Sequence, residues 1–171
     1  HTRRRRQRQM CIRDRCCCII KHSNPCGFAI GNSLIESFDR AVSCDPVSYF
    51  GGIVGFNKKI TADLAKKLIE PFLECIVCPD IDDDALEILK MKKNLRVIIY
   101  NNNYNFSNTS VRSVLGGMLS QSSSTKFNEE EWQIVTESKP DKINFNALRL
   151  GWKIVKYVKS NAIVIANDCL L

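Results

Sequence analysis

The stretch Cys16-Cys17-Cys18-Ile19-Ile20-Lys21-His22-Ser23-Asn24-Pro25-Cys26-Gly27 decides the fold, because an apolar run ends there in two titratable side chains. Five consecutive apolar residues predict a buried strand. The Asn-Pro and Cys-Gly dipeptides then predict a tight loop. Ligands of α/β domains bind where strands reach their carboxyl ends, so Lys21 and His22 are candidates for an active site. Spacing alone is equally compatible with a loop that carries one surface lysine and one surface histidine.

The rest of the chain alternates between short apolar runs and amphipathic segments. We expect helices over residues 33–42, from 61 to the residue before Pro71, over 85–92 and over 145–157. Strands are expected over 53–56, 75–78, 95–100, 133–136 and 162–166, with a bent strand or hairpin over 111–121. Ser33 and Glu36 have the spacing of a capping box at a helix start. Strands alternating with helices predict an α/β domain with a mostly parallel sheet and helices on both faces.

The basic charge is confined to the first residues. The chain of 171 residues has a net charge of +7, but residues 1–15 hold seven arginines against one aspartate, so residues 16–171 carry only +1. A surface that binds nucleic acid would spread its charge over the fold. We therefore expect 1–15 to be a disordered basic leader that is not native to the protein, with an RNA-binding arm as the alternative.

The nine cysteines do not predict a disulfide framework. Their number is odd, no secretory signal precedes them, and most lie in or beside apolar runs, where a thiol behaves as a small hydrophobe. This usage is typical of a reducing compartment. No apolar stretch approaches the roughly 20 residues of a membrane-spanning helix. A cytoplasmic protein without a membrane partner is the expectation.

Four stretches of the sequence carry a resemblance to a known family: they run from Lys21 to Gly27, from Ser43 to Val54, from Arg112 to Gln121 and from Val158 to Val164. In their order and separations they resemble the AICAR transformylase family, the formyltransferase region of bifunctional purine-biosynthesis enzymes. The resemblance covers residues 16–171. It implies a cytidine-deaminase-like fold, of which this chain would hold roughly one of the family's two halves, as the N-terminal part of the transformylase domain truncated at its C-terminus.

The resemblance also implies the chemistry. A formyl group would pass from the co-substrate 10-formyltetrahydrofolate to the 5-amino group of AICAR, in the route to IMP. Lys21 and His22 would be catalytic, while Asn24, Phe50, Gly51, Glu74 and Asn161 would contact the substrates. Histidine side chains titrate near neutral pH, so we assign the base role to His22 and the cationic role to Lys21. Around Glu74 the chain departs from the family pattern, since Cys78 and Asp80 flank the proline.

Two other functions are open at this stage. A zinc-dependent, deaminase-like hydrolase would use His22 with Cys75 and Cys78, but the deaminase signature has a glutamate two residues after the histidine, where this chain has Asn24. We therefore expect no metal. A non-catalytic interaction fragment is the second alternative. Small-molecule substrates and, in the full-length enzyme, a homodimer are the partners that the resemblance implies, and the fragment alone is expected to be inactive.

Overall fold

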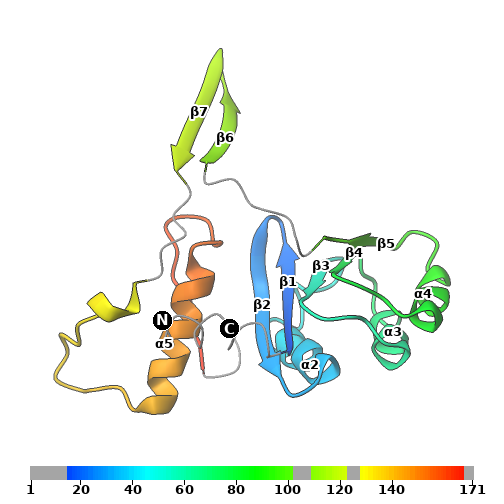
Figure 1. Ribbon diagram of the computed structural model, residues 1–171, viewed down its shortest axis with the longest axis horizontal. Coiled ribbons are helices and arrows are strands. Elements are labelled where there is room, and N and C mark those ends of the chain that lie inside the picture. Colours follow the sequence, from blue (N-terminus) through cyan, green and yellow to red (C-terminus); the bar gives the residue numbers. More distant parts are fainter. Residues whose placement is uncertain (1–14, 102–108, 123–127, 168–171) are drawn as a thin grey trace. The chain divides into compact units, whose positions relative to one another are not determined.

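The apolar run 16–20 lies in a strand inside a five-stranded sheet. The computed structural model describes residues 15–101, 109–122 and 128–167. The sheet has the order β2-β1-β3-β4-β5 (Figure 1). Its strands are β1 (Arg15–Lys21), β2 (Asn24–Gly31), β3 (Ile53–Phe56), β4 (Cys75–Cys78) and β5 (Arg96–Ile99). The α/β class predicted from the sequence is confirmed.

The directions of the strands place the end of β1 at an unexpected rim. β1 is antiparallel to β2 and to β3, whereas β3, β4 and β5 are parallel to one another. Ile20 pairs with Ile53, so Lys21 lies beside the residues that precede β3. The expected carboxyl-end rim is therefore wrong for the parallel strands: the end of β1 meets their amino ends, because β1 runs against them.

Three helices cover one face of this sheet: α2 (Leu34–Cys44), α3 (Ala62–Leu68) and α4 (Asp83–Lys90). The core combines their apolar side chains with one row of strand residues, which includes Ile19, Val54 and Ile76, all 0% exposed. α2 approaches β2 so closely that a Cβ on Gly27 would clash with the carbonyl oxygen of Ala41. On the opposite face of the sheet the side chains are less covered.

The predicted capping box is present at the start of α2. The hydroxyl of Ser33 accepts the N–H of Glu36 at 3.0 Å, and the Glu36 carboxylate accepts the N–H of Asn32 at 2.6 Å. The hydrogen bond from Asn32 is the main reason that the pKa of Glu36 lies below its ordinary value, with Arg40 adding to the effect. The cap fixes where α2 begins and therefore where β2 ends.

The chain divides into two units, one of residues 1–100 and 140–171 and the other of residues 101–139. Besides the sheet, the first unit contains α5 (Lys142–Val155). The chain that follows α5 packs closely against Gly151. A Cβ added there would lie 3.3 Å from the side chain of Val164 and 3.6 Å from that of Ala166, so a bulky side chain would not fit. The second unit contains the hairpin of β6 (Thr109–Val114) and β7 (Gly117–Ser122) and the 3-10 turn η1 (Glu129–Glu131).

Several predicted elements differ from the observed ones. The loop predicted up to Gly27 is wrong from residue 24 onward, because residues 24–31 form strand β2. The predicted strands 133–136 and 162–166 are also wrong, since neither belongs to a strand ladder in the described part of the chain. Residues 162–166 keep the alternating exposure of an extended segment. The hairpin predicted around Gly116 is confirmed. Of the expected leader, residues 1–14 lie outside the described residues and Arg15 begins β1.

Candidate active site at the amino ends of the parallel strands

The Lys21–His22 pair lies on a two-residue turn between β1 and β2. Lys21 pairs with Asn24 across the ladder, which leaves His22 and Ser23 as the turn itself. Both have positive φ, 52° and 64°, as the twist of a tight hairpin requires. Non-glycine residues occupy that region at a cost, and such strain collects at functional sites. The imidazole of His22 is consequently presented at the tip of the turn, exposed to solvent.

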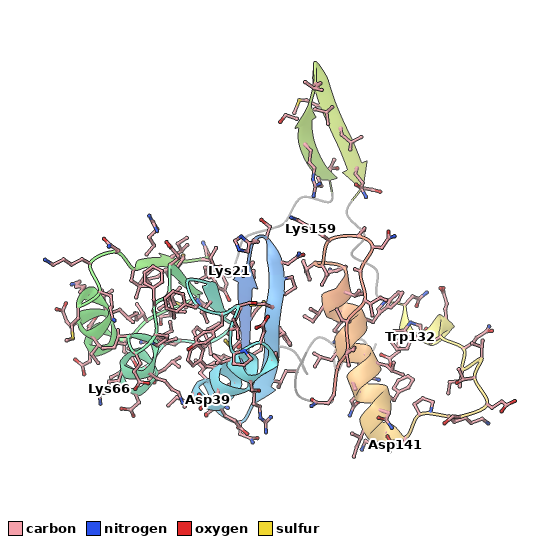
Figure 2. The ribbon with its side chains drawn as sticks, turned by 180° about the vertical axis from the view of Figure 1, so that it is seen from behind. Lys21, Asp39, Lys66, Trp132, Asp141 and Lys159 are labelled. Atoms are coloured by element: carbon pink, nitrogen blue, oxygen red, sulfur yellow. The ribbon has the colours of Figure 1, made fainter. Side chains whose placement is uncertain are left out.

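Lys21 does not extend freely into solvent (Figure 2). Its Nζ donates to the carbonyl oxygen of Phe50 at 2.8 Å and to that of Gly51 at 3.0 Å. An ammonium group has three N–H donors, so two are committed to the loop before β3 and one is left for a further acceptor. Two of the four family-like stretches thus meet at one cation.

Gly51 is required by this contact. Its φ is +63°, and a Cβ at this position would lie 3.0 Å from the Lys21 Nζ and 3.3 Å from the ring of Phe72. Its N–H donates to the carbonyl oxygen of Phe72 at 2.8 Å, and the rings of Phe50 and Phe72 lie 5.3 Å apart. Phe72 therefore supports the two carbonyls that hold Lys21. The sequence analysis missed Phe72, whose only signal in the sequence is an aromatic residue three positions before β4.

Glu74 lies one strand further along the same rim. Its N–H donates to the carbonyl oxygen of Gly52 at 3.1 Å, and its carboxylate pairs with Arg96 at 3.0 Å. Arg96 is a second residue that the sequence analysis did not assign to the site, although it stands out as the one charge in an apolar strand. An open pocket beside the pair is lined by Phe72, Glu74, Lys93, Asn94, Leu95 and Arg96.

The two predicted asparagines are brought near each other by the backbone. The side-chain oxygen of Asn24 accepts the N–H of Lys159 at 2.9 Å. Asn161 follows two residues later and is exposed. All seven predicted site residues therefore belong to the β1–β2 turn, to the loops before β3 and β4, or to a segment bound to that turn.

The thiols near the turn are poor nucleophiles. Burial raises the pKa of Cys18 to about 11 and raises that of Cys17 as well. Partial burial is also the main cause of the raised pKa of Cys26, with Asp45 adding to it and the Lys21 charge opposing it. Since the thiolate is the reactive form, none of these three thiols is suited to act as a nucleophile.

The described residues contain no group of three or more His, Cys, Asp or Glu side chains arranged to hold a metal ion. Cys75 and Cys78, three residues apart on β4, project toward opposite faces of the sheet. The zinc alternative thus finds no support in this geometry. Within the described ranges, no helix has the length and apolar character needed to cross a membrane.

Comparisons with known proteins place this chain in a family. The model of the AICARFT/IMPCHase bienzyme family matches residues 6–171. Three relatives, each described as "Bifunctional purine biosynthesis protein PurH", come from Clostridium botulinum (strain Loch Maree), Prochlorococcus marinus and Caldicellulosiruptor saccharolyticus. They are 49%, 46% and 45% identical over 152, 153 and 153 residues, which is 89%, 88% and 89% of this chain. The chain spans about 30% of the length of each.

The α/β fold, the family match and these relatives together define the class of protein as a bifunctional purine-biosynthesis enzyme family. The chain belongs to the AICARFT/IMPCHase bienzyme family.

Proposed function

We propose that this chain carries the Lys-His part of a formyltransferase site, which transfers a formyl group from 10-formyltetrahydrofolate to the 5-amino group of AICAR. The observation that carries the proposal is the Lys21 ammonium on the carbonyls of Phe50 and Gly51, which joins two of the family-like stretches. Family membership supports it. Because the chain spans about 30% of its relatives, the activity is proposed for the full-length enzyme.

The reaction makes three demands that these residues can meet. The aromatic amine is a weak nucleophile, since its lone pair is delocalised, so a base must take its proton during the attack. His22 on the exposed turn is the group we assign to that step. The carbonyl oxygen of the formyl group becomes negative as the tetrahedral intermediate forms, and the folate nitrogen needs a proton as it leaves. The third N–H of Lys21 is placed to serve one of these tasks.

The other residues of the rim would hold the substrates. The backbone at Phe50 and Gly51 can approach a ligand closely because Gly51 has no side chain. Glu74, fixed by Arg96, and Asn161 would supply polar contacts to the nucleotide. No metal ion takes part in the proposed reaction, and a cytoplasmic homodimer is the proposed setting of the full-length enzyme.

The test is the substitution Lys21→Met in the full-length enzyme. We expect formyl transfer to fall by about 10²- to 10⁴-fold, the usual contribution of a proton-transferring side chain. The matched control is Lys66→Met on α3, whose ammonium pairs with Asp63 at the surface. The same protein provides an internal control, because the IMP cyclohydrolase activity in the family's description should persist. Loss of cyclohydrolase activity with intact formyl transfer would assign this region to the other reaction and contradict the proposal.

A further inference from the structure

Asn24 makes a contact that its expected role does not explain. Its side-chain oxygen accepts the backbone N–H of Lys159 at 2.9 Å, across 135 residues of sequence. A residue that only binds substrate would point its amide toward an open site. Here the carbonyl half of that amide is already bound to the protein.

The position of Asn24 is set by the sheet. It is the first residue of β2, and it pairs with Lys21 across the turn that carries His22. Its backbone therefore moves with the two proposed catalytic residues. Any group that binds its side chain is held at a fixed separation from them.

The other partner belongs to the segment that follows α5. Further along this segment, Val164 packs near Gly151 of α5, and Val158, Val164 and Ile165 line a small cavity with Pro25 and Phe28 of β2. Val158 and Val164, on either side of residues 159–161, are thus partly buried. Its middle, Lys159 to Asn161, is exposed, so apolar packing contributes little there. The bond from Asn24 fixes the backbone where packing does not.

We propose that Asn24 is a positioning residue: its side-chain oxygen fixes the Lys159 backbone and so sets where Asn161 lies relative to the Lys21–His22 turn. The catalytic consequence rests on the proposed function, while the contact itself does not. Asn24 acts through Asn161 in this account and need not touch the nucleotide.

The test compares Asn24→Asp with Asn24→Ala in the full-length enzyme. Aspartate keeps an acceptor oxygen at the same position, whereas alanine removes it. One hydrogen bond contributes about 1 kcal/mol, which corresponds to roughly a five-fold change in an equilibrium constant. We therefore expect Asn24→Ala to raise the KM for the nucleotide about five-fold with a smaller effect on kcat, and Asn24→Asp to restore the KM. Equal damage by both substitutions would mean that the amide NH₂ group binds substrate, and would overturn the inference.

A second readout does not depend on activity. Amide hydrogen exchange at Lys159 should be faster in Asn24→Ala than in the unmodified enzyme, and close to normal in Asn24→Asp. Asn57→Ala is the matched control, because Asn57 likewise accepts a distant backbone N–H, that of Cys16 at 2.9 Å, and should leave Lys159 unaffected. Unchanged exchange in Asn24→Ala would overturn the inference. Absence of formyl transfer by the unmodified enzyme would instead overturn the proposed function, and the exchange data would still decide whether the contact exists.

Discussion

At the scale of single residues, the site depends on one cation held by backbone atoms. Lys21 is bound by two carbonyls from the loop before β3, and that loop is bound by Phe72. Backbone acceptors fix the ammonium without a neighbouring carboxylate, so the charge of Lys21 stays uncompensated by a direct ion pair among the described contacts. An anionic substrate or a developing negative charge would meet that charge directly.

Gly51 provides the residue-scale prediction. Gly51→Ala should destabilise the fold by about 1–2 kcal/mol, the usual cost of placing a Cβ in the left-handed region, and should displace Lys21 as well. Urea unfolding measures the first effect and nucleotide titration of the full-length enzyme the second. Gly55→Ala is the control, because its Cβ would lie 3.8 Å from the nearest atom, in ordinary contact. Equal stability of the two variants would contradict the strain that we assign to Gly51.

The family resemblance predicted part of this site. Lys21, Phe50 and Gly51 were grouped from the family-like stretches, and the structure brings them into contact. Sequence could not show that the partners of Lys21 are carbonyl oxygens, because every residue has one. The bond from Asn24 to Lys159 was hidden for the same reason, since its donor is a backbone N–H.

At the scale of elements, α2 is the helix whose start is marked most clearly in the sequence, by Ser33 and Glu36. Ser33→Ala should lower the free energy of unfolding by about 1 kcal/mol, because the first turn of α2 loses the acceptor for the Glu36 N–H. Chemical denaturation of the chain measures this. Thr61→Ala at the start of α3 is the control, since Thr61 makes no side-chain cap hydrogen bond, and its effect should be smaller. A larger loss from Thr61→Ala would show that the hydrogen bond from the Glu36 N–H to the Ser33 hydroxyl contributes little.

The elements that sequence missed are those whose neighbours decide their structure. Residues 24–31 begin with turn-forming residues, yet they pair with β1 as an edge strand, where a proline without an N–H is tolerated. Residues 162–166 have the alternating pattern of a strand but lie beside α5 instead of a partner strand. Periodicity records which side of a segment is buried, not what covers it.

At the scale of the whole molecule, the direction of β1 decides at which rim of the sheet the proposed site lies. Because β1 is antiparallel to β3, the turn after β1 lies at the same rim of the sheet as the loops that precede β3 and β4. If β1 were one more parallel strand, Lys21 would lie at the carboxyl ends of β3, β4 and β5 instead of at their amino ends. Pairing directions follow from contacts across the whole sheet, and the local sequence of β1 does not encode them.

The family relationship also sets the scale at which function must be tested. The relatives are about three times as long as this chain, so the proposed formyl transfer, and the role of the turn in it, must be measured on the full-length enzyme.

The most direct measurement is single-turnover formyl transfer by the full-length enzyme carrying His22→Ala, with both substrates saturating. The base assigned to His22 predicts a rate lower by about 10²- to 10⁴-fold, while the dissociation constant of the nucleotide changes by less than about three-fold. A single-turnover rate equal to that of the unmodified enzyme would contradict the account, because the exposed imidazole on the turn would then have no part in the chemistry.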